Sequence, residues 1–354
     1  MGSPDIRQIN GLGGATPQTS KVAIVGPSSR DDADVDYTFA QVDIATTLVD
    51  WGGNCGNISS AVGPYAVNAG LVIPVSDGEL QTVRIHNTNT GKIIRSTFPV
   101  SGGRAAIDGD TRIAGVPSSG ARIDLEFEDP SGAVTGSLLP TGNVRDTITL
   151  DDGSAIEVSI VDATNPTVFI RPESMGIEGH ESAAELDSDP GFLQRIEEIR
   201  GIAAVMLGLV DSPSRAVEVT PGLPKIGIIS SPRGYIASDG TTMAPEDFDI
   251  LVRMMSMQHP HRACQITAGI CTGVAATVVG TIVNEVFDAS PVLSDDEPVD
   301  VRLGHPSGLM TTAVRGVMVS DGRPRISGVG VVRTARAILD GVAHVPRRLL
   351  EDSQ

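Results

Sequence analysis

The sequence predicts an α+β fold with two enclosed helices, and three observations support this. Two segments, Ile58–Ala69 and Ala263–Val283, are apolar on all sides, as helices are when other elements surround them. Many short strand-like segments, separated by turn residues, fill the chain between them. A length of 354 residues exceeds one ordinary hydrophobic core, which favours two domains.

Local signals place the individual elements. A helix is expected at Phe192–Leu207, because Asp189-Pro190 precedes it and its apolar residues recur at helical spacing. A strand near the C-terminus is expected at Val331–Ala337. The other expected strands are Thr82–His86, Ile93–Pro99, Ala121–Phe127, Ile156–Ile160 and Thr167–Ile170. We expect the crossover between domains at Ala163–Pro166, giving domains of residues 1–163 and 164–330.

A cysteine stands where the first apolar helix is expected to begin. Cys55 lies in the glycine-rich run Trp51–Asn57, directly before the segment that starts at Ile58. The free N–H groups and the positive dipole end of a helix stabilise a thiolate, and glycines let the backbone approach a ligand closely. Such a site can bind a carboxylate and move a proton. The alternative is that Cys55 is a small apolar filler behind a tight turn.

A lysine follows the glycine-rich loop further upstream. The chain holds three lysines, at Lys21, Lys92 and Lys225, among 26 lysine and arginine residues. A lysine loses its proton when it is desolvated or close to another cation, whereas an arginine effectively does not. Lys21 is therefore a candidate base, the alternative being a solvated loop lysine.

These motifs, taken together, resemble one enzyme family. The matching segments run in order through nearly the whole chain: Met1–Asp5, Gly11–Lys21, Phe39–Val42, Asp50–Asn57, Ala61–Pro64, Asn87–Lys92 and Gly304–Gly308. They are similar to the PrpF family of cofactor-independent isomerases, which includes 2-methylaconitate isomerase, methylitaconate isomerase and the oxalomesaconate tautomerases.

The resemblance implies a diaminopimelate epimerase-like fold. In that fold two pseudo-symmetric domains each wrap a β-sheet around a central helix, and the active site lies in the cleft between them. A C-terminal strand within residues 331–348 could complete the first domain. Compared with the family pattern, the first strand and its glycine-rich loop are expected to be missing ahead of Met1.

The same resemblance implies the reaction and the site. The reaction is an allylic proton shift, a cis-trans isomerisation or a tautomerisation of an unsaturated di- or tricarboxylate, without a cofactor. Lys21 and Cys55 are the implied catalytic pair, and whether Cys55 transfers a proton or only orients the substrate stays open. The expected substrate-binding residues are Ser20, Asn54, Gly56, Asn57, Asn89, His305 and Ser307.

Charge limits the partners. A formal net charge of −18 argues against nucleic acid, which needs a basic surface. An anionic substrate must therefore meet local positive charge inside an acidic protein. The candidate sources are Lys21, Lys92, Lys225, Arg84, Arg302 and His305.

Cysteine content and hydropathy indicate the cellular compartment. Three cysteines, no signal peptide and no uninterrupted membrane-spanning apolar run favour a cytoplasmic protein. Cys264 and Cys271 show no metal-ligand spacing with histidine, so no metal is expected. His259 and His261 are interpreted as a pair that fixes the entry to the second central helix.

Two other functions remain open. A racemase or epimerase with two cysteine bases would need Cys264 opposite Cys55. An N-terminally truncated, inactive protein could bind an aconitase-like partner as an accessory. If the protein is the isomerase, it could form a homodimer and could be functionally linked to an aconitase-like enzyme.

Overall fold

A computed structural model describes residues 1–287, 292–320 and 322–345 of the chain. The first half of its sheet runs in the order β1 (Lys21–Pro27), β2 (Val35–Val42), β4 (Leu80–Asn87), β5 (Lys92–Ser101) and β9 (Ile123–Glu128). Two smaller strands belong to this sheet, β3 (Val49–Asp50) beside β2 and β6 (Arg104–Ala105) beside β5, while β7 (Thr111–Arg112) and β8 (Ser119–Gly120) form a separate two-stranded sheet. Burial alternates along β4, where Val83 and Ile85 face the core.

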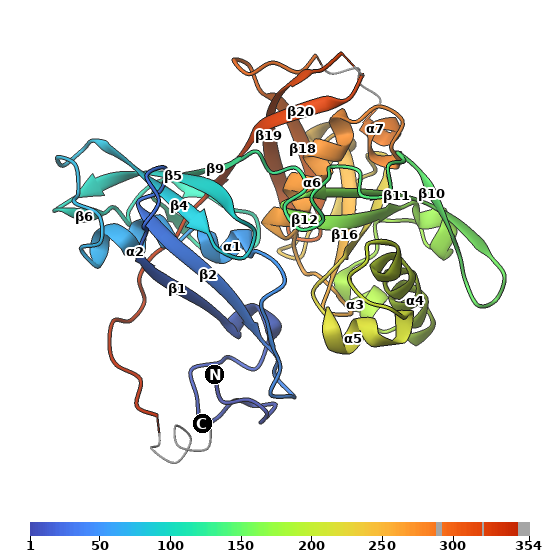
Figure 1. The fold of residues 1–354 in the computed structure, drawn as a ribbon, viewed down its shortest axis with the longest axis horizontal. Helices are drawn as coiled ribbons and strands as arrows, with labels where there is room; N and C mark the ends of the chain where they lie inside the picture. The colour runs from blue at the N-terminus through green and yellow to red at the C-terminus, as the bar shows by residue number, and fades with distance from the viewer. Residues whose placement is uncertain (288–291, 321, 346–354) are drawn as a thin grey trace.

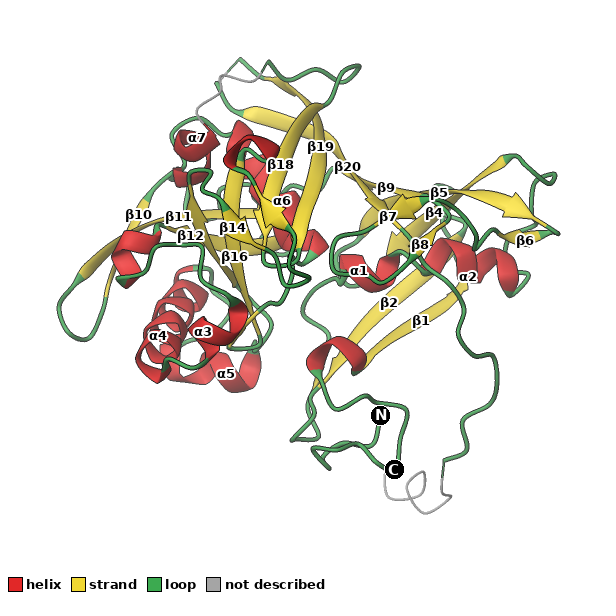
Figure 2. Cartoon of the chain, turned by 180° about the vertical axis from the view of Figure 1, so that it is seen from behind, coloured by secondary structure: helices red, strands yellow, loops and turns green. Residues whose placement is uncertain are grey.

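Two short helices cover this half of the sheet, where one longer helix was expected over Ile58–Ala69. They are α1 (Gly56–Ser59) and α2 (Val62–Asn68), and they lie against the sheet in Figure 2. Pro64 explains the break between the two helices. Pro64 has no N–H to donate to the Ser60 carbonyl, and its ring would clash with that carbonyl in a continuous helix.

The second half wraps its strands around a buried helix (Figure 1). All twelve residues of α6 (Ile266–Thr277) are buried, and α6 contacts β11, β12, β18, β19 and β20. The strands are β10 (Asp146–Thr149), β11 (Ala155–Ala163), β12 (Asn165–Ile170), β13 (Lys225–Ser230), β16 (Ile250–Ser256), β18 (Val299–His305), β19 (Gly308–Met318) and β20 (Pro324–Arg333). Smaller strands are β14 (Tyr235–Ile236), β15 (Thr242–Met243) and β17 (His259–Pro260).

One strand joins the two halves. β20 pairs antiparallel with β19 on one side and with β9 on the other, so the sheet is continuous from β1 to β10. The C-terminal strand expected at Val331–Ala337 therefore exists, but it ends at Arg333 and begins earlier, because it follows β19 as a hairpin. One hydrophobic core contains buried apolar residues of both halves, Phe127 and Ile270 among them.

The remaining helices lie in the second half. α3 (Ala183–Asp187), α4 (Pro190–Met206) and α5 (Ala216–Val219) group together away from α6, and α4 confirms the expected amphipathic helix. α7 (Ile282–Phe287) is separate from α6, although one helix was expected over Ala263–Val283. The chain leaves the helix because Val278 is extended and Gly280 has a φ of +90°.

The expected α+β class and the expected central strands are confirmed. The domain boundaries stay a prediction. β10 and β11 precede the expected division at Ala163, yet they pair with each other and with β12. No helix in the described part of the chain combines the length and apolar character needed to cross a membrane.

Candidate active site

Lys21 and Cys55 meet in the structure. Lys21 is the first residue of β1, and Cys55 precedes the first residue of α1. The Lys21 Nζ donates a hydrogen bond to the Cys55 Sγ at 3.3 Å. The contact lets a proton pass between the amine and the thiol. The two predicted catalytic residues are thus positioned to act as a pair.

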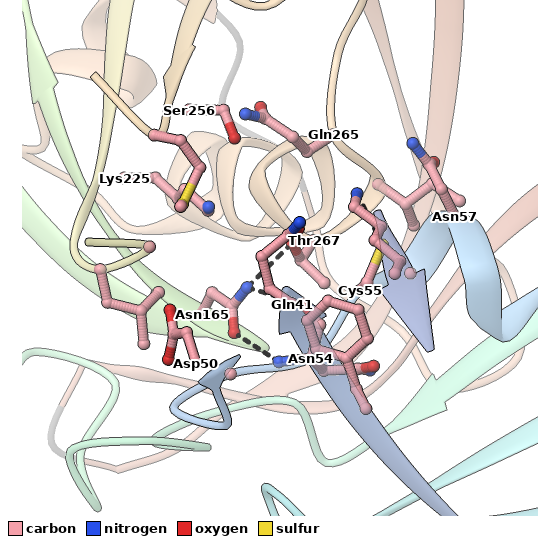
Figure 3. Close-up of a pocket in the computed structure, with 18 residues that line it drawn as sticks. Gln41, Asp50, Asn54, Cys55, Asn57, Asn165, Lys225, Ser256, Gln265 and Thr267 are labelled. Carbon is pink, nitrogen blue, oxygen red and sulfur yellow. Dashed lines mark hydrogen bonds between the residues drawn. The ribbon is translucent and has the colours of Figure 1, made fainter. Parts of the chain in front are cut away.

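The pair opens into a pocket formed by both halves of the molecule (Figure 3). The pocket contains about 540 Å³ of empty space, part of it open to solvent. Gln41, Asn54 and Asn57 line it from the first half, and Ser256, Gln265 and Thr267 line it from the second. The predicted residues Asn54, Gly56 and Asn57 are therefore brought together with Lys21 and Cys55.

A glycine allows the two helix starts to approach. A side-chain carbon added to Gly56, at the start of α1, would lie 2.6 Å from side-chain atoms of Ile266, the first residue of α6. Any larger residue would force the helix starts apart. Gly56 is thus required for the shape of the pocket, whether or not its N–H also binds substrate.

Asn165 ties the two walls together, which the sequence did not reveal. Its Nδ2 donates to the Asn54 carbonyl at 3.0 Å and to the Thr267 hydroxyl at 3.1 Å, and its Oδ1 accepts from the Asn54 N–H at 3.3 Å. These bonds appear as dashed lines in Figure 3. The Asn165-Pro166 pair signalled only a crossover in the sequence.

A second lysine enters the pocket from the opposite wall. Lys225 begins β13 and lines the pocket. Burial, together with the positive charge of Lys21, lowers the pKa of Lys225 to about 8. Asp50, also in the wall, opposes this effect, but the Lys225 Nζ makes no hydrogen bond or ion pair with the described residues. Sequence reasoning named Lys225 only as a source of charge, and the scarcity of lysine was the available signal.

The other predicted cations are neutralised elsewhere. Lys92 pairs with Asp129 at 2.9 Å, and it does not line this pocket. Arg84 pairs with Asp34 at 2.7 Å. Arg302 pairs with Asp249 at 2.6 Å. Of the described lysines and arginines, only Lys21 and Lys225 line the pocket.

Ser20 and Asn89 lie behind the pocket wall rather than in its lining. The Ser20 hydroxyl donates to Gln8 Oε1 at 2.8 Å, and its carbonyl accepts from Gln41 Nε2 at 3.1 Å. Asn89 Nδ2 donates to the Trp51 carbonyl at 3.0 Å, which holds the loop that leads to Cys55. Their positions suit residues that shape the site from behind.

His305 and Ser307 also lie outside this pocket. His305 lines a second cavity, described below. Burial, with the charge of Arg333 nearby, lowers the pKa of His305 to about 3, so the ring is neutral. Its Nδ1 accepts from the Ser307 N–H at 3.2 Å, and the Ser307 hydroxyl donates to the Arg262 carbonyl at 2.5 Å. Direct substrate contact by either residue stays a prediction.

Comparison with known proteins identifies the family. The family model described as "PrpF protein" matches residues 1–346. The chain belongs to the PrpF family. It is 42% identical to 3-methylitaconate isomerase of Eubacterium barkeri, over 99% of this chain and 89% of the relative. It is 36% identical to 2-methyl-aconitate isomerase of Shewanella oneidensis and 38% identical to 4-oxalomesaconate tautomerase of Pseudomonas putida, each over 98% of this chain and 87% of the relative.

Solved structures agree with the assignment. The crystal structure of methylitaconate-delta-isomerase is 42% identical and superposes with a TM-score of 0.77, covering 96% of this chain and 85% of that one. A probable proline racemase from Agrobacterium radiobacter, 13% identical with a TM-score of 0.51 over 90% of this chain and 76% of that one, shares the fold. The expected diaminopimelate epimerase-like fold and the expected class, an isomerase, are confirmed for this PrpF protein.

The second thiol of the rival epimerase is not opposite Cys55 in this PrpF protein. Cys264 and Cys271 are buried, and burial raises the pKa of each thiol to about 12. Neither lines the pocket of Lys21 and Cys55, where Gln265 stands instead. Cys271 Sγ lies 3.2 Å from the Val161 carbonyl, inside the core. The geometry therefore favours a lysine-cysteine pair over two thiols.

The histidine pair at the entry to α6 makes separate contacts. His261 Nδ1 accepts from the Ala263 N–H at 3.1 Å, just before α6, and His259 pairs with Asp187 at 2.7 Å. Among the described residues no group of three histidine, cysteine or acidic side chains could hold a metal ion. His261 thus holds the chain as it enters the helix.

Proposed function

We propose that this PrpF-family isomerase moves a proton along an unsaturated di- or tricarboxylate of the 2-methylaconitate kind, without a cofactor. The observation that carries the proposal is the 3.3 Å contact between Lys21 and Cys55, in a pocket that both halves line. The substrate class is supported by the names of the relatives at 36–42% identity. It is supported independently by two lysines in a pocket of an otherwise acidic protein.

The first wall supplies the proton transfer. One member of the Lys21–Cys55 pair takes a proton from an allylic carbon, and the freed electron pair moves through the double bond toward a carboxylate. The other member, or the same one, returns a proton at the far end of the allyl unit. The substrate keeps its composition, and a proton passing along the Lys21–Cys55 hydrogen bond restores the pair.

The second wall supplies the charge. The intermediate is a dienolate, whose negative charge gathers on the carboxylate that the double bond meets. The Lys225 ammonium has no ion-pair partner among the described residues, so a substrate carboxylate can pair with it. An anion beside Lys225 also raises the pKa of its ammonium again, because opposite charges favour the charged form. Binding and charge stabilisation therefore fall to Lys225, with the N–H groups of Gly56 and Asn57 as expected additional donors.

Proton NMR in deuterated water tests the proposal. The protein is incubated with 2-methylaconitate, methylitaconate and oxalomesaconate, beside a Lys21→Ala variant and a Lys92→Ala control whose lysine lies outside the pocket. We expect double-bond migration or geometric isomerisation with deuterium entering at carbon, retained in Lys92→Ala and lost in Lys21→Ala. Folded protein that exchanges no carbon-bound hydrogen with any of these acids would contradict the proposal and favour the accessory binding role.

Narrower expectations belong to the same proposal. A homodimer and a functional link to an aconitase-like enzyme stay predictions. A cytoplasmic location is supported by three cysteines that are all free, as expected in a reducing compartment.

A further inference from the structure

A second cavity shares Asn57 with the Lys21–Cys55 pocket. It contains about 740 Å³ of empty space, part of it open to solvent. Its polar lining comes from Asn57, Ser60, Cys264, His305, Arg333 and Thr334. Asn57 is exposed and lines both cavities, so they adjoin at the start of α1.

The cavity contains a cation without a counter-ion. Arg333 is the last residue of β20, at the seam where that strand pairs with β9. Its Nη2 contacts the Met310 sulfur at 2.8 Å, and its buried Nε has no hydrogen-bond acceptor in the described parts of the chain. No aspartate or glutamate lines the cavity, and His305 is neutral, so nothing in the described lining balances the guanidinium.

The half-buried guanidinium of Arg333, with its buried Nε unpartnered, is unfavourable without an anion. Removing a charge from water destabilises the folded protein unless hydrogen bonds and an opposite charge replace the water. Burial lowers the pKa of Arg333, which reflects the same cost, yet an arginine does not escape it by losing its proton. A planar carboxylate matches the fork of N–H donors that a guanidinium presents. The arrangement is therefore incomplete without an anion.

We propose that the cavity around Arg333 is a carboxylate-binding site. Because Asn57 borders both cavities, the carboxylate belongs to the same unsaturated acid whose reacting carbons face Lys21 and Cys55. This second statement rests on the proposed function. It makes Arg333 a specificity residue that selects acids with a carboxylate remote from the reacting carbons.

Thermal unfolding tests the site without turnover. Unfolding temperature is measured for the wild type, Arg333→Met and Arg336→Gln, with tricarballylate, glutarate or butyrate at equal ionic strength. Arg336 is exposed and three residues away, so its variant controls for lost charge. We expect Arg333→Met to unfold at a higher temperature than the wild type without anion, because an apolar side chain replaces an unbalanced charge. We expect it to lose most of the stabilisation that tricarballylate gives the wild type and Arg336→Gln.

Two results would overturn the site. One is equal stabilisation of Arg333→Met and the wild type by tricarballylate. The other is an Arg333→Met protein less stable than the wild type and still anion-responsive, which indicates a purely structural arginine. Neither result depends on the reaction, so a failed turnover assay leaves this test intact.

Kinetics identify the source of the carboxylate. If it belongs to the substrate, Arg333→Met raises KM roughly tenfold to a hundredfold with kcat changed by only a few-fold, since a charge-assisted contact remote from the reacting carbons is lost. An Arg333→Lys variant keeps the positive charge but loses the fork of N–H donors. Its KM should lie between those of the wild type and Arg333→Met. An unchanged KM together with an Arg333-dependent thermal response assigns the site to a separate carboxylate and overturns the shared-substrate statement.

Discussion

The two walls of the active-site pocket carry different chemistry. In the first wall, the α1 cap Cys55 accepts a hydrogen bond from Lys21. In the second wall, Gln265 occupies the corresponding cap of α6, and Lys225 stands without a partner among the described residues. The starts of α1 and α6 therefore line one pocket, but the first wall holds the Lys21–Cys55 contact and the second holds the lone cation Lys225 at the start of β13. Under the proposed function, this difference means that one half carries out proton transfer and the other binds the anionic substrate.

Loss of the Lys21 amine should have the largest effect. We expect Lys21→Ala to lower kcat roughly 10²- to 10⁴-fold, the usual contribution of a positioned acid or base. Steady-state turnover and deuterium incorporation should fall together, while the unfolding temperature stays near that of the wild type. A Lys21→Ala enzyme with normal turnover would remove the first wall from the chemistry.

The cysteines test the asymmetry directly. We expect Cys55→Ala to lower turnover by at least about tenfold, because it removes the hydrogen-bond partner of Lys21. Cys264→Ala should change turnover by less than a few-fold, although it costs about 1 kcal/mol of stability as a core truncation. Equal loss in the two variants would support the two-thiol epimerase and end the proposed division between walls.

The role of Lys225 can be tested through the pH dependence of KM. Its pKa of about 8 predicts that KM for the anionic substrate rises as the pH passes 8, because the lysine loses its charge. Lys225→Arg keeps its charge, so its KM should stay flat across pH 7–9. A KM of the wild type that does not change between pH 7 and 9 would contradict a binding role for Lys225.

The same lysine links stability to pH. The folded pKa is lowered below the unfolded value of 10.5, so the unfolded chain binds more protons between about pH 8 and 10.5. The contribution of Lys225 to stability should therefore rise with pH across that window. Denaturant unfolding of the wild type and Lys225→Met isolates this rise as a difference, since the buried cysteines titrate equally in both proteins. If the unfolding free energies of the wild type and Lys225→Met changed in parallel from pH 7 to 10, the pKa of Lys225 would not be lowered in the folded state.

The close contact between the starts of α1 and α6 can be tested by overpacking it. Gly56→Ala places a carbon 2.6 Å from Ile266 atoms, which should cost roughly 1–3 kcal/mol of stability through overpacking. Gly26→Ala in β1 meets no atom within 4 Å and serves as the matched control. Turnover should fall in Gly56→Ala and not in Gly26→Ala. Equal unfolding free energies of the two variants would indicate that the helix starts can separate freely.

Several features could be derived from the sequence. The all-round apolar character of 263–283 predicted an enclosed helix, and α6 is buried at every position. Cys55 could be placed at a helix start because the glycine-rich run ends where the apolar segment begins. Lys21 drew attention through the scarcity of lysine. All of these are local signals, read within a few residues of one another.

Tertiary structure decided the rest. Lys225 lies about 200 residues from Lys21 in the chain, and only the packing of β13 against the pocket brings them together. Asn165 and Arg333 likewise gain their importance from their tertiary surroundings, Asn165 by bonding to a loop and to α6, and Arg333 by lacking a counter-ion in the described lining of its cavity. The pKa of a side chain and its need for a partner depend on burial and on neighbouring charges. Neither quantity is present in a linear pattern of residues, because both arise only when the two halves close around the same space.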